Sequence, residues 1–480
     1  MKRIMIGFLC LAAAAGAWAA TYRVAVHPKD YASTLRTLAS QHRDIAGADR
    51  RAGIIEVVTD DEGLKTLKDL GEPLEVRAVF TEKAGAGWLD EYTDPEEMEQ
   101  FITDLAAQYP DLMEVIPLTD PLFEGHIVYA VKITHGSGTK PVFLMDAQHH
   151  AREVMTAEIA RDAIQYLVTQ YGIDPQVTQW VNAVEIWIVP IVNPDGADYV
   201  FKRDAMWRKN RHPNCAVDIN RNYEFSWNQC KGSSGQCSAD DFRGTGAASE
   251  PETQGVTALM ETLKPIFYLT YHSYGEYIIW PYGCDYSSEN DALGDIGGAL
   301  NSVLEDDTGS TGQYQMGTSF DTLYITDGTA DDEAYGRLGT FAYCIEVNSD
   351  RAGGFQPNYD QWRDITVQRQ RAAWQFFLDQ TLNGPLVRGT VRSVLGHRPL
   401  ADVTMTVDGI TFTDGESPRT TGAQGRYFFI GRKNTSYTLT FSAPGYGTVT
   451  RTVAIGDGPT DLDIALIPAF PPAVALLSAF

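Results

Sequence analysis

The stretch PVFLMDAQHHAREVMTAE, residues 141–158, decides how the centre of the chain folds. An apolar run that reads as a buried strand ends before the doublet His149–His150, and a helical pattern follows Glu153. A histidine and a glutamate three residues apart, on a turn that enters a helix, lie on one face of it. His150 and Glu153 are therefore candidate ligands of a metal ion, although a solvated helix start would explain the same residues.

A third ligand has to come from another part of the chain. His272 in LTYHSYG follows a strongly apolar run, and open α/β sheets place their sites at such strand ends. Three ligands of these types and one water complete a catalytic zinc site. Spacing leaves two alternatives open. His149 lies four residues before Glu153, which is also a helical spacing, and a histidine at a strand end is more often a hydrogen-bonded core residue.

Strand-like runs alternate with helical patterns across residues 88–383. These nearly continuous apolar strands predict an α/β fold, with a mixed, mostly parallel sheet between helices. SEPE, residues 249–252, reads as a capping box at the start of one helix. Residues 20–87 read as a small α+β unit of strand, helix, strand, helix and strand, followed by a Gly/Ala linker. Residues 384–468 read as an antiparallel β-sandwich, and residues 469–480 form an apolar tail.

Composition bounds the partners and the compartment. The formal charge of −25 argues against nucleic acid as a partner, because phosphate binding needs a basic face. Residues 1–19 combine Lys2 and Arg3, an apolar run and Ala17-Trp18-Ala19, which is typical of a secretory signal. This run and the tail are too short to span a bilayer. We therefore expect a secreted or periplasmic chain without a membrane span, in which disulfides are permitted.

Further polar residues stand in motifs around the three candidate ligands. Arg208 lies in WRKNR, Asn220 and Arg221 lie in DINRN, and Tyr324 lies in the loop LYITDG. Glu346 stands on the apolar strand FAYCIEV, where a charge is costly unless it is paired or used. Taken alone, the arginines read as surface charge and Tyr324 as an ordinary loop residue.

These motifs follow one another in an order that is typical of one protein family. HAREV, NPDG, WRKNR, DINRN, SEPETQ, YHSYG, the Tyr324 loop and the Glu346 strand follow one another between about residues 90 and 383. In them the chain resembles the zinc metallocarboxypeptidases of the carboxypeptidase A/B type. The resemblance implies a peptide hydrolase that acts on peptide or protein C-termini. It also implies that HARE begins with the ligand, so that His150, Glu153 and His272 hold one Zn²⁺.

The same resemblance implies roles for the remaining site residues. Asp218 would orient a ligand histidine. Asn220, Arg221 and Tyr324 would bind the terminal carboxylate, which explains removal of the last residue only. Arg208 would stabilise the oxyanion, with help from Arg152 in the substrate site. Glu346 would be the general base and then the general acid, acting with a zinc-bound water whose pKa falls to about 7.

Specificity and disulfides also follow from the resemblance. Asp331 falls at the specificity position, where an acidic residue in the family goes with removal of C-terminal Lys or Arg. The alternative is that Asp331 and Asp332 are loop carboxylates that face water. Cys215 and Cys237 match a family disulfide, which leaves the partners of Cys230, Cys284 and Cys344 open. The leading segment resembles an inhibitory pro-domain, cleaved near Lys83–Gly87 by an activating protease, and the last domain resembles a transthyretin-like, carboxypeptidase regulatory-like module.

Two other functions compete with this interpretation. An amidase or an endopeptidase acting on cell-wall peptides can use the same scaffold, but the clamp of Asn220, Arg221 and Tyr324 argues against it. A catalytically silent binding protein would use the β-sandwich as its working part. Glu346 and the three ligands argue against that reading, because binding alone does not need a base.

Overall fold

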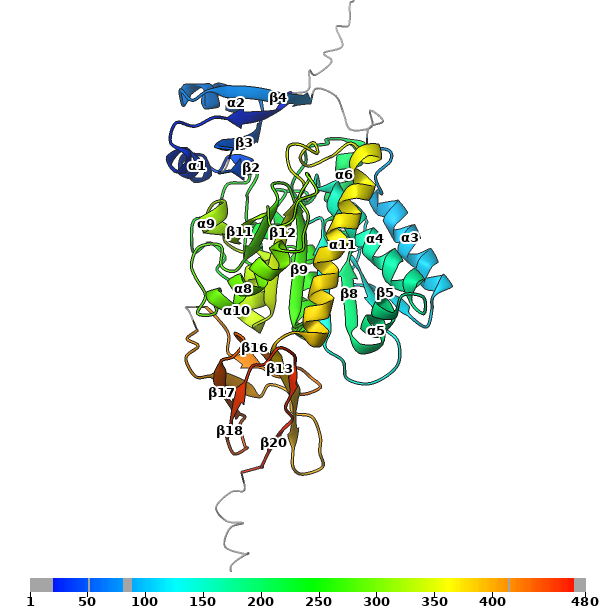
Figure 1. The fold of residues 1–480 in the computed structure, drawn as a ribbon. Coiled ribbons are helices and arrows are strands. Elements are labelled where there is room, and N and C mark those ends of the chain that lie inside the picture. The colour runs from blue at the N-terminus through cyan, green and yellow to red at the C-terminus, as the bar shows by residue number, and fades with distance from the viewer. Residues whose placement is uncertain (1–19, 51, 81–88, 413–414, 470–480) are drawn as a thin grey trace, which may run out of the picture.

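A computed structural model describes residues 20–50, 52–80, 89–412 and 415–469 of the chain (Figure 1). The expected secretory signal, the linker with its expected cleavage segment and nearly all of the apolar tail lie outside the described residues. Within the described ranges, each helix falls short of the length or the hydrophobicity that crossing a bilayer requires.

An eight-stranded sheet forms the centre of the molecule, in the order β11-β10-β12-β9-β7-β8-β6-β5. Its β7, β8, β9 and β12 pair in parallel, as do β10 and β11, whereas the pairings β10–β12, β6–β8 and β5–β6 are antiparallel. The predicted mixed, mostly parallel sheet is therefore confirmed. The strands are β5 (Met113–Pro117), β6 (Tyr129–Ile133), β7 (Val142–Ala147), β8 (Glu185–Val189), β9 (Phe267–Ser273), β10 (Tyr277–Trp280), β11 (Gln315–Thr318) and β12 (Phe341–Val347).

Helices cover this sheet in two groups. One group, α4, α5 and α11, packs together and over β7 and β9, while α10 packs on α7, β9 and β12. The helices are α3 (Pro95–Gln108), α4 (Val154–Gln170), α5 (Pro175–Ala183), α6 (Pro194–Lys202), α7 (Pro251–Leu263), α8 (Asn290–Asn301), α9 (Ser319–Thr322), α10 (Ala330–Leu338) and α11 (Tyr359–Asn383). The predicted capping box at α7 is wrong. The N-cap is Glu250, which makes no side-chain cap, and Ser249 Oγ donates to Glu250 Oε1 at 2.7 Å instead.

The N-terminal unit, the described part of residues 20–80, contains one strand more than the sequence predicted. Its antiparallel sheet has the order β2-β3-β1-β4. The unpredicted strand is β2, DIAGAD, whose two aspartates and one glycine are residues that strands usually exclude. The elements are β1 (Thr21–Val26), α1 (Tyr31–Ser40), β2 (Asp44–Asp49), β3 (Ile54–Thr59), α2 (Asp61–Asp69) and β4 (Leu74–Phe80). Figure 1 shows β2 on the side that faces the central domain.

The C-terminal domain begins two residues after α11 and lies at the end of the central domain away from the N-terminal unit (Figure 1). Its sheet β15-β14-β17-β18 is antiparallel throughout. The other sheet departs from the predicted pattern, because β13 pairs antiparallel with β16 but in parallel with β19 and β20. The strands are β13 (Leu386–Ser393), β14 (Thr404–Val407), β15 (Arg419–Thr420), β16 (Arg426–Ile430), β17 (Ser436–Ser442), β18 (Val449–Ala454), β19 (Thr460–Asp461) and β20 (Ile464–Leu466).

Two disulfides tie the loops of the central domain together. Cys215 is bonded to Cys237, which confirms the predicted pair, and Cys230 is bonded to Cys284. Cys344 is a free, buried thiol on β12.

Candidate metal site and catalytic cleft

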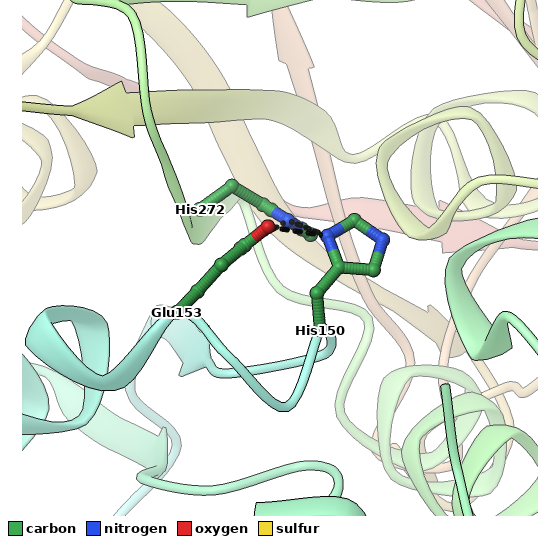
Figure 2. A group of neighbouring side chains, drawn as sticks. All are labelled: His150, Glu153 and His272. Atoms are coloured by element: carbon green, nitrogen blue, oxygen red, sulfur yellow. Dashed lines mark hydrogen bonds and ion pairs between the residues drawn. The ribbon is translucent and has the colours of Figure 1, made fainter. Parts of the chain in front are cut away.

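Three side chains from two strand ends converge on one point (Figure 2). His150 and Glu153 lie in the turn between β7 and α4, and His272 is the sixth residue of β9. His150 Nδ1 lies 2.7 Å from Glu153 Oε1, and His272 Nδ1 lies 3.1 Å from Glu153 Oε2. The two Nδ1 atoms are 3.1 Å apart. All three side chains are buried, so solvent does not compete for these atoms.

This arrangement fits a divalent cation. Two imidazole nitrogens that face each other beside a carboxylate form the donor set of a catalytic zinc site. Burial lowers the pKa of His272, which favours the neutral ligand form. Although burial opposes ionisation of Glu153, the two histidines hold its pKa below the usual value. His149 is directed elsewhere. Its Nε2 is hydrogen-bonded to Tyr223 Oη at 2.8 Å, and its ring stacks on that of His272.

A second group of metal-ligating side chains lies away from this point. Glu96, His126 and Asp198 bring ligand atoms within 4.8 Å of one another. A cation of the protein already lies there, because Lys202 Nζ is 2.7 Å from Asp198 Oδ1 and 3.5 Å from Glu96 Oε1. Of the two groups found among the described residues, only the buried one lacks a competing ammonium.

Asp218 connects His150 to Arg208. Its Oδ1 lies 3.3 Å from His150 Nε2, and its Oδ2 accepts from Arg208 Nη2 at 2.8 Å and from Nε at 3.0 Å. Although burial favours the neutral acid, Arg208 and then His150 hold the pKa of Asp218 well below its usual value. The negative charge of a carboxylate close to Nε2 favours the imidazole proton on that atom, which leaves the Nδ1 lone pair for a metal. Arg208 thereby becomes a fixed cation at the rim of the same site.

Strand register places Glu346 beside the ligands. In the parallel pair β9–β12, Glu346 is the direct partner of His272, although 74 positions separate them in sequence. Burial and the negative charge of Glu153 raise the pKa of Glu346 well above its usual value, against the opposing charges of Arg208, Arg221 and Arg152. A carboxyl group in such surroundings is suited to taking up and returning a proton.

A cavity of about 60 Å³ joins these residues to the predicted substrate groups. Asn220 Oδ1 accepts from the Ala330 backbone N–H at 3.0 Å, which ties the DINRN motif to the start of α10. Arg221 is buried and donates through Nη1 to the Asn220 carbonyl at 2.7 Å, while its Nε has no partner among the described residues. The lining includes His150, Glu153, Arg208, Asn220, Arg221, Tyr324, Asp331, Cys344 and Glu346.

The two carboxylates at the start of α10 are buried, which excludes the alternative that they face water. Asp331 is 6% exposed and lines the cavity, whereas Asp332 is 1% exposed and accepts from the Gly283 N–H. Burial raises the pKa of Asp331. No ion pair among the described residues involves Asp331. A buried carboxylate without a cation is the electrostatic complement of a basic side chain.

The N-terminal unit contributes to the wall of this cavity, which is consistent with the expected inhibitory pro-domain, although the residues that make the contact were not predicted. Arg152, expected to contact substrate, instead forms a two-point ion pair with Asp44 on β2, with Nη–Oδ distances of 2.5 and 2.6 Å. Both side chains are buried, and the guanidinium also lies over the Phe355 ring. Ile45, Ala46 and Gly47 continue the cavity wall. No local signal pointed to Asp44, because β2 itself lacks a strand pattern.

Comparison with known proteins agrees with these observations. The sequence model of the family described as zinc carboxypeptidase matches residues 98–371, and that of the carboxypeptidase regulatory-like domain matches residues 386–467. Human Carboxypeptidase O is 32% identical over 244 residues, which are 48% of this chain and 64% of that protein. A zinc carboxypeptidase of Simulium vittatum is 31% identical over 277 residues, 55% of this chain and 89% of that protein.

The fold is also found in a solved structure. The crystal structure of thrombin activatable fibrinolysis inhibitor superposes with a TM-score of 0.64 at 20% identity, over 76% of this chain and 99% of that one. The sequence match covers more than half of the chain and includes the converging ligands, Asp218 and Glu346. The chain therefore belongs to the zinc carboxypeptidase family of peptide hydrolases.

Proposed function

We propose that this protein is an exported zinc carboxypeptidase, made as a covered precursor, that removes C-terminal Lys or Arg from peptides and proteins. One observation carries the proposal. Two of the candidate metal ligands line one cavity together with the groups expected to act on substrate, namely His150, Glu153, Arg208, Arg221, the uncompensated Asp331 and the acid Glu346. The third ligand, His272, is the register partner of Glu346. A compartment outside the cytoplasm is supported by the two disulfides.

The chemistry assigns a role to each group. His150, Glu153 and His272 would hold the zinc ion, which when bound lowers the pKa of a water and polarises a carbonyl. Glu346 takes a proton from the attacking water and later donates it to the leaving nitrogen. Arg208, fixed by Asp218, faces the negative charge that develops on the scissile carbonyl oxygen. Asp218 keeps His150 in the tautomer that leaves Nδ1 free.

Substrate selection uses two charged anchors. The free Nε of Arg221 and the Tyr324 hydroxyl are available to the terminal carboxylate, which an internal peptide bond does not offer. Asp331 supplies the negative charge for a Lys or Arg side chain. The carboxylate clamp favours this function over an amidase or an endopeptidase, and the position of Glu346 favours it over a silent binding protein.

The N-terminal unit holds the precursor inactive in this proposal. Asp44 occupies Arg152 with the same two-point geometry that a carboxylate substrate would use. The core of the unit extends onto Leu323 and Tyr324, so the clamp tyrosine is covered by the same surface. Cleavage in residues 81–88 by another protease would release this cover.

Blocked dipeptides that end in Arg, Phe or Glu test the function directly. The cleaved protein, loaded with zinc, is expected to release Arg at least about tenfold faster than Phe or Glu, because only Arg neutralises the buried Asp331. Asp331→Asn should remove most of this preference and leave slow release of Phe unchanged. A chelator should stop all three reactions. Release that survives the chelator would refute the zinc site, whereas preferred release of Phe would refute the specificity alone.

A further inference from the structure

A loop of the C-terminal domain, residues 415–421, packs directly on helix α10. The Ser417 N–H donates to the Gly336 carbonyl at 2.8 Å. Arg419 forms an ion pair with Glu289, and these side chains are 8% and 6% exposed. Gly339, which ends α10 with a φ of +71°, leaves room for this arginine, because a Cβ there would lie 2.6 Å from Arg419 Nε. Figure 1 shows α10 at the end of the central domain that faces this domain.

Glu289 passes the contact on to the helix. The Tyr335 hydroxyl on α10 donates to Glu289 Oε2 at 2.7 Å, so one carboxylate holds both Arg419 and Tyr335. The Tyr335 ring packs against that of Tyr282, whose hydroxyl donates to Glu416 of the same C-terminal loop. Two charged residues of the C-terminal domain therefore fix an aromatic pair of the central domain.

The other end of α10 forms the floor of the cleft. Asp331 lies in its first turn, four residues before Tyr335, and residues at this spacing share one face of a helix about one turn apart. Asn220 and the Gly283 N–H hold the same first turn. Because a hydrogen-bonded helix moves as a unit, the seating of Tyr335 sets the position of Asp331 in the cavity.

Other contacts between the two domains do not involve α10. Lys264 Nζ donates to Thr420 Oγ1 at 2.7 Å, and Arg432 lies 3.2 Å from Asp291 and 2.9 Å from Asp295. These contacts attach the domain. The Arg419 pair differs because it is buried against the specificity helix, and removal of Arg419 would leave a buried, uncompensated Glu289 that must move toward water.

We propose that the C-terminal domain is a positioning element of the specificity pocket, in which Arg419, through Glu289 and Tyr335, fixes α10 and hence Asp331. This inference rests on the proposed role of Asp331 as the anchor for a basic side chain. It gives the regulatory-like domain a defined task in the reaction of the central domain. Arg419 itself touches neither substrate nor metal ligand.

Steady-state kinetics of Arg419→Met in the cleaved, zinc-loaded protein tests the inference. For a blocked dipeptide ending in Arg, kcat/KM should fall about tenfold, chiefly through KM, because a small misplacement of an anchor weakens substrate binding. A dipeptide ending in Leu should change by less than about twofold, since it does not use Asp331. Arg432→Met removes an equal charge from the same interface and should leave both substrates unchanged. Zinc content should be equal in all variants.

The double variant Glu289→Gln/Arg419→Met leaves no unpaired charge and provides the same test if the single variant does not fold. A folded variant that keeps the wild-type ratio of the two kcat/KM values, or that loses both equally, overturns the inference. Asp331→Asn separates the two proposals. If it abolishes the Arg preference while Arg419→Met does not, only the positioning role fails. If the wild type shows no Arg preference, both fail.

Discussion

The N-terminal unit and the C-terminal domain attach to the central domain through the same kind of contact, yet with opposite expected consequences. Each interface contains one buried pair of a carboxylate and an arginine, Asp44 with Arg152 and Glu289 with Arg419. In the first pair the arginine belongs to the central domain, and in the second it belongs to the attached domain. The N-terminal unit contributes residues 45–47 to the cavity wall, while the C-terminal domain contributes none of the lining residues.

The effect of each ion pair depends on what its arginine would otherwise bind. Asp44 occupies the guanidinium of Arg152, so in the proposed function the pair blocks a group that would otherwise bind substrate. Arg419 has no competing ligand, so its pair only fixes the helix behind the pocket. The two attached units also differ in the length of chain that connects them to the central domain. The C-terminal domain follows α11 after two residues, whereas eight residues, 81–88, separate β4 from the next described segment.

Release of the N-terminal unit should give the largest effect. Cleavage within residues 81–88, followed by removal of the unit, is expected to raise the hydrolysis rate of a small blocked dipeptide about a hundredfold. A cover that leaves about 1% of molecules open reduces the apparent activity by that fraction. Time courses of activity and of cleavage on gels should run in parallel. If the intact precursor hydrolysed the dipeptide as fast as the cleaved form, the N-terminal unit would not be inhibitory. The proposed difference between the two interfaces would then be refuted.

Asp44→Asn should open the cover without cleavage. The uncleaved chain is expected to gain about tenfold in activity, because Arg152 is left buried without its counter-charge and the interface loses stability. Asp69→Asn, an exposed aspartate of α2 in the same unit, is the matched control and should stay inactive. Equal activity of the two variants would show that the ion pair is not what holds the cover.

Lowering the pH should weaken the binding of the N-terminal unit, by a smaller factor than the gain in activity expected for Asp44→Asn. Although burial favours the neutral acid, Arg152 holds the pKa of Asp44 below its ordinary value of 3.8. A lowered pKa stabilises the interface above that ordinary value, and this stabilisation is lost as the pH falls through the value in the complex. Between pH 6 and pH 3 the cleaved unit should bind about fivefold more weakly in gel filtration. In Asp44→Asn this part of the pH dependence should be absent.

Arg419→Met should have the smallest effect on masking. The uncleaved chain is expected to stay as inactive as the wild type, although its free energy of unfolding falls by about 3 kcal/mol because Glu289 loses its buried partner. Chemical denaturation and dipeptide hydrolysis on one preparation measure both quantities. Arg432→Met, whose ion pairs are exposed, should lose far less stability. A rise in the activity of the uncleaved Arg419→Met variant would show that the Glu289–Arg419 pair, like the Asp44–Arg152 pair, helps to keep the precursor inactive.

Much of the central domain could be predicted because its signals are local. The run VFLMDA and the helical pattern after Glu153 show strand and helix within a few residues. The alternation of such runs is sufficient for the α/β sheet. The prediction failed at β2, where DIAGAD carries no strand pattern and is held by its pairing with β3 and by contacts with the cleft. It also left the partners of Cys230 and Cys284 open, because 54 residues separate these two cysteines.

Short spacings and the order of motifs were enough to identify the residues with the chemistry of a zinc hydrolase, including His150 with Glu153 and the strand-borne Glu346. How these groups meet could be read only from the folded chain. Sheet register places Glu346 opposite His272, and the docking of β2 turns Arg152 toward Asp44 across 108 positions of chain. Ligand and strand patterns depend on neighbouring residues, whereas the partner of a buried charge depends on how distant segments pack against each other.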